Sequence, residues 1–228
     1  MYCMRLNLKT DHYLARLCNA SNSTTPEITK NINSFLPKLL QATTQFGYSA
    51  TSIGHDQSQV FGLAQCRADI STDDCSACIQ EAIKEIRSFC TEKVDARVWY
   101  DYCFIRYNTE NFIGKLDTNY GSYYWNVENV TNPKTFNQGL GSLMDKINAV
   151  AGASVQCTGD LSELSCRQCL AIAVGKFPAQ CENSKGCRVL YSSCYVRYEL
   201  YPFNLPLDKK AAPKSSSMTN YRSVVAKF

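Results

Sequence analysis

The chain has 228 residues, which allows one or two small domains and is too short for a barrel enzyme with a further domain. Hydrophobic residues make up 45% and charged residues 19%, a balance that excludes a disordered chain. The formal net charge is +4, but basic residues form no run longer than Lys209-Lys210, so we expect no nucleic-acid partner. The 13 cysteines indicate a disulfide-rich protein of an oxidising compartment.

The N-terminal segment lacks the features of an export signal. Residues 1–11 hold Arg5 and Lys9, with no apolar stretch of about 7 to 15 residues between or after them. Because so many thiols suit a reducing cytosol poorly, we expect a trimmed or misassigned start that hides the signal peptide of a secreted protein. No run of about 18 apolar residues occurs, so we also expect no membrane span.

The first predicted element is a helix that begins at Pro26. Its apolar residues lie on one helical face, namely Ile28, Ile32, Phe35, Leu36, Leu39 and Leu40. Pro37 removes an interior hydrogen bond at a cost of about 3 kcal/mol, so the helix is expected to kink or to begin late. A strand is predicted over 59–65, and a second helix follows the capping residues 71–74.

Later segments predict the same order of elements again. Residues 96–107 are rich in Val, Ile, Tyr and Phe and predict antiparallel strands, as do residues 187–198. Helices are predicted around Leu140 to Ile147 and over 170–177. The chain is short before Cys157, which predicts that the counterpart of strand 59–65 is missing there. Each half is therefore predicted to be α+β, an antiparallel sheet packed against two helices.

Five cysteines recur at a constant displacement of 91 residues, from Cys66 to Cys157 onward, which indicates a tandem duplication. The first copies are Cys66, Cys75, Cys78, Cys90 and Cys103, and the second are Cys157, Cys166, Cys169, Cys181 and Cys194. Glycine, Asn and Asp interrupt the pattern between 111 and 120. We expect domains over 12–112 and 120–207, the second shortened between Ile147 and Cys157, and a flexible tail over 208–228.

The Cys-x2-Cys pairs at Cys75 and Cys166 allow three interpretations: half of a zinc site, a redox dithiol, or half-cystines with different partners. A zinc site needs four ligands, and the chain offers only His12 and His55 beside cysteines whose spacings do not fit. A redox dithiol is typical of a βαβ setting with few other cysteines. Structural disulfides are favoured, so we expect no metal and no cofactor. Six cysteines in one repeat permit 15 pairings.

Motifs of common enzyme classes do not occur. The chain has no Gly-x-Ser-x-Gly, no His-Glu-x-x-His and no phosphate-binding glycine loop. Neither His12 nor His55 recurs in the second repeat, and we expect both to be surface residues. We therefore expect a protein that is not an enzyme, and a thiol oxidoreductase is kept only as a third alternative.

The spacing Cys-x8-Cys-x2-Cys occurs in both repeats, each time followed by Arg-Val-x-Tyr-x-x-Cys-[Phe/Tyr]-[Ile/Val]-Arg-Tyr. This pattern resembles the plant ginkbilobin-homologous domain, also called the stress-antifungal domain. The tandem form over about 12–207 is similar to cysteine-rich repeat secretory proteins and to the ectodomains of cysteine-rich receptor-like kinases. The resemblance implies a secreted protein of the plant apoplast with an antifungal or stress role, which binds mannose-like carbohydrate without catalysis.

The family's disulfide pairing, carried over, implies Cys18–Cys90, Cys66–Cys75, Cys78–Cys103, Cys157–Cys166 and Cys169–Cys194. The first cysteine of the second repeat is absent, because Trp125-Asn126 stands where Cys18-Asn19 stands in the first. Cys181 is then expected to pair with Cys187, which leaves Cys3 as the free thiol.

The resemblance also implies a mannose site of one Asn, one Arg and one Glu, whose amide, guanidinium and carboxylate suit sugar hydroxyls. The matching residues are Asn126, Arg188 and Glu199 in the second repeat and Asn19, Arg97 and Asn108 in the first. Asn108 replaces the carboxylate by a neutral amide, so we expect a degraded first site and sugar binding in the second repeat. Alternatively, Arg97 and Arg188 only pair with carboxylates or cap backbone carbonyls.

Three Asn-x-Ser/Thr sequons predict N-glycosylation at Asn19, Asn22 and Asn129. Aromatic clusters could stack on sugars or bind proteins, although core packing is the more common role: Tyr100, Tyr102, Tyr120, Tyr123, Tyr124 and Trp125. The expected partners are mannose-containing glycans. The alternative function is an apoplastic protein-interaction module with a decayed sugar site, which binds receptor ectodomains.

Overall fold

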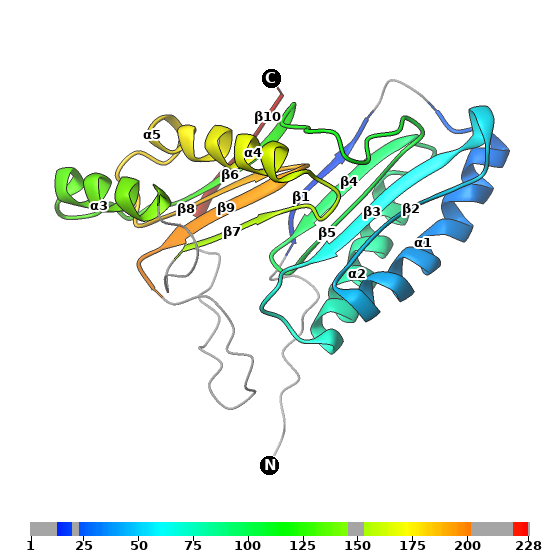
Figure 1. The fold of residues 1–228 in the computed structure, drawn as a ribbon, viewed down its shortest axis with the longest axis horizontal. Helices are drawn as coiled ribbons and strands as arrows, with labels where there is room; N and C mark the ends of the chain where they lie inside the picture. The colour runs from blue at the N-terminus through cyan, green and yellow to red at the C-terminus, as the bar shows by residue number, and fades with distance from the viewer. Residues whose placement is uncertain (1–12, 20–22, 146–152, 202–220, 228) are drawn as a thin grey trace, which may run out of the picture. The chain divides into compact units, whose positions relative to one another are not determined.

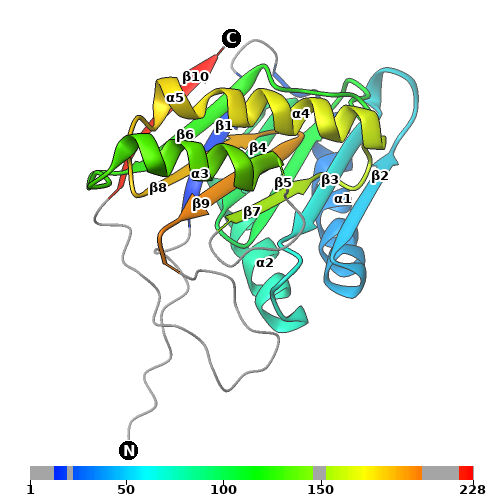
Figure 2. The same ribbon diagram turned by 60° about the vertical axis from the view of Figure 1, so that its left-hand side comes forward.

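The structure is a computed structural model that describes residues 13–19, 23–145, 153–201 and 221–227 (Figure 1). The chain divides into two compact units, Met1–Ile113 and Gly114–Phe228. In each unit the helices cover one face of an antiparallel sheet (Figures 1 and 2). The expected α+β class, with two tandem disulfide-bonded sheets and their helices, is confirmed.

The first unit contains a five-stranded sheet in the order β1-β4-β5-β3-β2. Its strands are β1 (Tyr13–Cys18), β2 (Tyr48–Ile53), β3 (Val60–Cys66), β4 (Asp95–Tyr100) and β5 (Cys103–Asn108). A short 3-10 helix, η1 (Asp56–Ser58), follows β2. Because successive residues of a strand point to opposite faces, Val98 and Ile105 enter the core beneath the helices while Arg97 and Arg106 point to the other face.

Two long helices pack on the first sheet, α1 (Pro26–Phe46) and α2 (Thr72–Phe89). Thr25 caps α1 by accepting a hydrogen bond from the Ile28 amide, and Ser71 caps α2 by accepting one from the Asp74 amide. The expected starts of both helices are confirmed. Helix α1 ends at Gly47, whose φ of 74° lies in the left-handed region that favours glycine.

Of the two outcomes expected from Pro37, a kink or a late start, the late start is wrong, because α1 begins at Pro26. The helix runs without a break through this exposed residue. A proline in a helix leaves the carbonyl four residues earlier without its donor, which here is the carbonyl of Asn33. Arg87 of α2 donates from Nη2 to that oxygen at 3.5 Å, so a neighbouring helix supplies the missing hydrogen bond.

The second unit also contains a five-stranded sheet, in the order β10-β6-β8-β9-β7. Its strands are β6 (Tyr120–Asn126), β7 (Ala153–Cys157), β8 (Gly186–Tyr191), β9 (Cys194–Glu199) and β10 (Tyr221–Lys227). Its helices are α3 (Pro133–Asp145), α4 (Glu163–Gly175) and the short α5 (Phe177–Gln180). Val189 and Val196 lie in a core with Phe177 and Ala173 of these helices.

Two expectations for the second half are wrong. Strand β7 pairs with β9 as β3 pairs with β5, so the strand expected to be missing is present. Within the described residues, the second sheet instead has no counterpart of β2. Part of the expected flexible tail forms strand β10, whose backbone pairs with β6 along Tyr221–Lys227 and completes the opposite edge of the sheet.

Six disulfides join the described cysteines: Cys18–Cys90, Cys66–Cys75, Cys78–Cys103, Cys157–Cys166, Cys169–Cys194 and Cys181–Cys187. These are the pairs that the family resemblance and the leftover cysteines imply. In each Cys-x2-Cys segment the two cysteines have different partners, and both bonds fasten a helix to the sheet. Cys3 lies outside the described residues.

Candidate functional site

In each sheet, two adjacent inner strands carry arginines directly opposite each other. Arg97 of β4 is the register partner of Arg106 of β5, and Arg188 of β8 is the partner of Arg197 of β9. All four are buried, on the sheet face that points away from the helices. Because like charges directly opposite each other destabilise a sheet, such a pair requires a nearby carboxylate.

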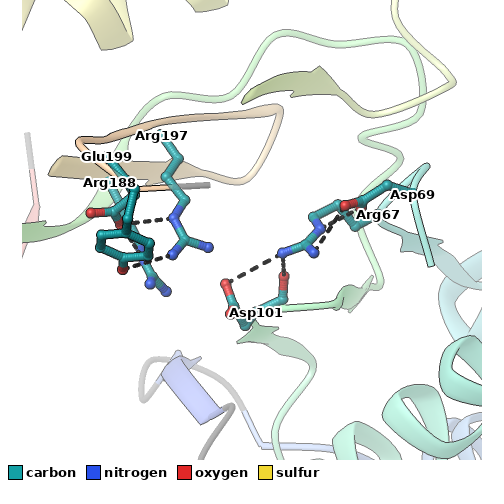
Figure 3. Close-up of polar contacts among 7 residues, drawn as sticks. Arg67, Asp69, Asp101, Arg188, Arg197 and Glu199 are labelled. Carbon is teal, nitrogen blue, oxygen red and sulfur yellow. Dashed lines mark hydrogen bonds and ion pairs between the residues drawn. The ribbon is translucent and has the colours of Figure 1, made fainter. Parts of the chain in front are cut away.

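In the second unit that carboxylate is Glu199, two residues beyond Arg197 on β9. Its Oε1 accepts from Arg197 Nε at 2.8 Å and from Arg188 Nε at 3.4 Å (Figure 3). The side chain of Glu199 is 0% exposed and that of Arg188 is 2% exposed. Arg197 also donates from Nη2 to the Tyr201 hydroxyl at 3.4 Å. One buried carboxylate thus orients two guanidinium groups.

In the first unit the carboxylate stands on the other strand. Asp95 of β4 accepts from Arg97 through both oxygens, Oδ1 from Nε at 3.3 Å and Oδ2 from Nη2 at 3.2 Å. The register pairs Asp95 with Asn108, and in the second unit it pairs Gly186 with Glu199. Asn108 is therefore not a simple loss of charge, because its cross-strand partner carries the carboxylate instead.

The two asparagines of the implied sugar site occupy equivalent positions. Cys18–Ala96 is the last register pair between β1 and β4, and Trp125–Cys187 is the last between β6 and β8. Asn19 and Asn126 each follow the first residue of that pair. The Asn19 amide donates to the Asp95 carbonyl at 3.0 Å. The structure thus brings Arg188 and Glu199 into contact and places Asn126 at the next register position.

Short hydrogen bonds fix the turns next to these residues. Asn126 Oδ1 accepts from the Glu128 amide at 2.9 Å, and Asn108 Oδ1 accepts from the Glu110 amide at 2.9 Å. Both asparagines therefore begin turns with a side-chain hydrogen bond to the backbone two residues on. The sequence signal for this role is the residue type alone, since Asn is common at such positions.

Two tyrosines next to the arginine clusters are also equivalent. Tyr107 donates its hydroxyl to the Lys93 carbonyl at 3.1 Å, and Tyr198 donates to the Ser184 carbonyl at 3.0 Å. Burial raises the pKa of Tyr107 and of Tyr198 well above the usual range for a phenol, and the negative charge of Asp95 or Glu199 raises it further. Both phenols therefore stay neutral near pH 7.

A further arginine cluster in the first unit was missed by the sequence analysis. Arg67 is buried, donates from Nε to Asp69 Oδ1 at 2.5 Å, and approaches Asp101 Oδ1 with Nη1 at 3.8 Å (Figure 3). Its guanidinium also lies 4.9 Å from the ring centroid of Tyr102. The displacement of 91 residues does not reveal it, because Arg67 corresponds to Thr158 in the second repeat.

In the second unit, the loop after β7 and the turn before β9 form hydrogen bonds with the segment that begins this unit. Asp160 Oδ2 accepts from the Gly114 amide at 2.7 Å, and Ser193 Oγ accepts from the Asp117 amide at 2.8 Å. Thr158 donates its amide to the Ser193 carbonyl at 3.0 Å, as Arg67 does to the Tyr102 carbonyl at 2.8 Å. The backbone contact is the same, but neutral hydroxyls replace the buried charge.

The remaining predicted residues are placed as follows. His55 is exposed before η1, whereas His12 and Asn22 lie outside the described residues. Asn129 is exposed in the turn after β6, and Tyr123 and Tyr124 are buried. Within the described ranges, no group of three or more His, Cys, Asp or Glu side chains could hold a metal ion. None of the helices described has the length and apolar character that crossing a bilayer requires.

Comparison with known proteins gives two kinds of match. A family model described as salt stress response/antifungal matches residues 17–110 and again 114–201. The chain is 49% identical over 220 residues to cysteine-rich repeat secretory protein 55 of Arabidopsis thaliana, covering 85% of this chain and 84% of that protein. It is 36% identical over 193 residues to the antimicrobial ginkbilobin-2-like protein of Castanea crenata, covering 76% of this chain and 80% of that protein.

A solved structure shows the same arrangement of elements. The crystal structure of the tandem DUF26 ectodomain of the Arabidopsis thaliana cysteine-rich receptor-like protein PDLP8 superimposes with a TM-score of 0.76 at 29% identity. The match covers 83% of this chain and 98% of that ectodomain. The two relatives compared above are named as secretory and antimicrobial proteins.

Proposed function

Because the chain belongs to the salt stress response/antifungal family, with one copy of the domain in each half, we propose that it is a secreted plant defence protein that binds carbohydrate. It is not an enzyme, in keeping with the secretory and antimicrobial proteins to which it is similar. We place it in the apoplast, with mannose-bearing glycans as its ligands. An antifungal or stress role follows from the same family.

The arginine and carboxylate arrangement of the second unit is the observation that supports carbohydrate binding best. An ionised carboxylate accepts from sugar hydroxyls, while a guanidinium and an amide donate to sugar oxygens. Arg197 donates to Glu199, Glu199 in turn accepts from Arg188, and Asn126 lies at the adjoining position of the sheet. Groups that are ordered before binding lose little entropy when a ligand arrives.

A glycan array probed with the oxidised protein tests this proposal. We expect binding to mannose-bearing glycans, and we expect Glu199→Gln to abolish it. The matched control is Glu163→Gln, because Glu163 is an exposed carboxylate that also pairs with an arginine, Arg167 Nη2, at 2.5 Å. Arg97→Ala should leave binding nearly unchanged, since it alters the first unit.

A second variant separates recognition from folding. Arg188→Lys keeps the positive charge beside Glu199 but removes the planar fork of donors. We expect it to lose glycan binding while its circular dichroism and disulfide map stay those of the parent. No binding by the parent protein would reject the carbohydrate proposal. Binding by Arg188→Lys and Glu199→Gln as strong as that of the parent would reject this site.

A protein-interaction module is the second candidate function. Several large apolar side chains are exposed in the described residues, among them Phe46, Phe89, Leu164 and Leu200. Exposed apolar side chains are a usual component of protein-binding surfaces. Saturable binding to purified receptor ectodomains, unchanged by enzymatic removal of their glycans and lost in Phe46→Ser or Phe89→Ser, would support this function over the first.

A further inference from the structure

A cavity of about 360 Å³ opens on the second unit beside the end of β6. It is lined by Trp125, Asn126, Val127, Asn129, Ala179, Gln180, Glu182 and Ser184. The lining combines one indole ring with amide and carboxylate side chains, and its volume is within the usual range for small-ligand sites. Neither Arg188 nor Glu199 belongs to it, and Asn126 is the one residue that the cavity shares with the proposed sugar site.

The turn along one side of the cavity is held firmly. The Glu128 carbonyl accepts from the Lys185 amide at 2.9 Å, and the Val130 amide donates to the Asn183 carbonyl at 2.8 Å. The side chains of Glu128 and Lys185 also form an ion pair at 2.8 Å. This turn therefore presents Asn129 in a fixed position, with the exposed Thr131 two residues further on.

Several polar groups of the lining are available to a ligand. The half-buried Trp125 and the side chains of Gln180 and Glu182 make no side-chain hydrogen bond with another described residue. An aromatic ring offers a flat apolar surface to the C–H face of a pyranose. The amide of Gln180 and the carboxylate of Glu182 can bond to hydroxyl and acetamido groups.

We propose that this cavity holds the innermost N-acetylglucosamine of an N-linked glycan attached to Asn129. Asn129 is both a lining residue and the acceptor of the sequon Asn129-Val130-Thr131, so the sugar begins inside its own site. A tethered sugar has an effective concentration in the millimolar range, which lets even a weak site stay occupied. A free saccharide would have to bind without that advantage.

The attachment follows the usual chemistry of the secretory pathway. The Asn129 Nδ2 atom loses one proton and bonds to the anomeric carbon of the sugar, whose bond to the diphosphate of a lipid-linked oligosaccharide donor breaks. The diphosphate leaves on the lipid carrier, and nothing is oxidised or reduced. The inference rests on the secretion of the chain and not on its recognition of external glycans.

Three glycoforms of one protein test the proposal. The Ser21→Ala, Asn22→Gln double variant leaves Asn129 as the sole sequon, and secretion from a host with unfucosylated high-mannose glycans supplies the intact form. An endoglycosidase trims the glycan to a single N-acetylglucosamine, and an amidase removes it entirely. We expect the intact and trimmed forms to share one Tm, and the amidase-treated form to melt about 2 to 4 °C lower.

Trp125 gives a second measurement on the same samples. Acrylamide should quench its fluorescence more strongly in the amidase-treated form than in the trimmed form. Because the amidase converts Asn129 to Asp, the Thr131→Ala variant is the matched control: it lacks the glycan but keeps the asparagine, and it should match the amidase-treated form. Trp125→Phe should keep the glycan and lose about half of the Tm difference.

Several results would overturn the proposal. These are an unoccupied Asn129 in the secreted protein, equal Tm and quenching in all three glycoforms, or a loss of stability already at the trimmed stage. Saturable binding of free N-acetylglucosamine by the trimmed form would show that the cavity is open, and would also overturn it. Failure of the glycan array described above leaves this inference intact, so the two proposals are distinguished.

Discussion

Cys18 in the first unit and Cys187 in the second stand on the two sides of equivalent strand pairs. Cys18 pairs with Ala96 across β1 and β4, whereas Trp125 pairs with Cys187 across β6 and β8. Each cysteine bonds to the residue that directly follows a helix, Cys90 after α2 or Cys181 after α5. Cys90 and Cys181 thus occupy the same position of the repeat, whereas their partner lies on β1 in the first unit and on the neighbouring strand, β8, in the second.

The carboxylate of the arginine cluster has moved in the same way. It stands on β4 as Asp95 in the first unit and on β9 as Glu199 in the second, and the position opposite it is Asn108 or Gly186. Neighbouring positions on one face of a sheet lie within side-chain reach of each other. A repeat can thus keep an interaction after losing the residue that first made it, provided a cross-strand neighbour takes over.

The largest effect is expected when the carboxylate of the second unit is removed. Glu199→Gln leaves Arg188 and Arg197 without their shared acceptor, and we expect the second unit to lose about 3 to 5 kcal/mol of unfolding free energy. Denaturant titration followed by the fluorescence of Trp125 measures the loss. Trp99 lies in the first unit and serves as the internal reference, whose transition should not move.

Moving the carboxylate back sharpens the same comparison. Asp95→Gly should destabilise the first unit, and adding Asn108→Glu should recover at least half of the loss, because it reproduces the arrangement of Gly186 and Glu199. A double variant no more stable than Asp95→Gly alone would show that the two clusters are not interchangeable.

The disulfides give the next largest difference. Cys18–Cys90 closes a loop with a sequence separation of 72, and Cys181–Cys187 one of only 6. By loop entropy, replacing both cysteines by Ala should cost the first unit about 4 kcal/mol and the second about 2 kcal/mol. The measurement is again denaturant unfolding with Trp99 and Trp125 as separate probes. Equal losses would contradict the loop-length argument.

A transfer variant tests the exchange of the cysteine directly. Trp125→Cys combined with Cys187→Ala restores the first unit's arrangement in the second, and we expect a new disulfide to Cys181. Peptide mapping without reduction identifies the bond. Free thiols at position 125 and at Cys181 would show that β6 and β1 differ in their distance from the helical segment.

A smaller effect is expected at the proline of α1, which has no counterpart among the described residues of α3. Pro37→Ala should stabilise the first unit by about 2 kcal/mol, less than the ~3 kcal/mol typical of a helix interior, because Arg87 already donates to the Asn33 carbonyl. Thermal unfolding of the variant measures the gain. A loss of stability would mean that the exposed ring makes contacts that matter more than the hydrogen bond.

The smallest effect concerns the two tyrosines that the repeats share. Tyr107→Phe and Tyr198→Phe should each cost about 1 kcal/mol, because each removes one hydrogen bond to a carbonyl. Burial raises both pKa values, so the stability that the neutral phenols confer is present below about pH 10 and falls as the pH rises above it. The variants should show a shallower loss of Tm between pH 9 and about pH 11.

Local signals made much of the fold predictable. Thr25 and Ser71 lie directly before apolar residues in helical spacing, and both cap helices in the structure. The segments around Arg97 and Arg188 are rich in β-forming residues and form the central strands. The strands β1, β2, β6 and β10 were missed, because their alternation is weak and their pairing depends on neighbours distant in sequence.

The candidate site was only partly predictable. Arg188 and Glu199 could be named from the motif, but their burial and their shared contact with Arg197 depend on strand register. Asn108 was interpreted as a loss, since a sequence read along one strand does not show that Asp95 lies opposite. Cross-strand neighbours become visible only when the hairpin is folded.

The position of the moved cysteine also decides what a single cut in the backbone does. Between Cys18 and Cys103 every peptide bond lies inside at least one disulfide loop, so one cleavage leaves that segment as a single covalent molecule. No described disulfide spans the chain from Cys103 to Cys157, which includes β6 and α3. A protease that cuts α3 therefore divides the protein into two molecules, and only noncovalent contacts delay their separation.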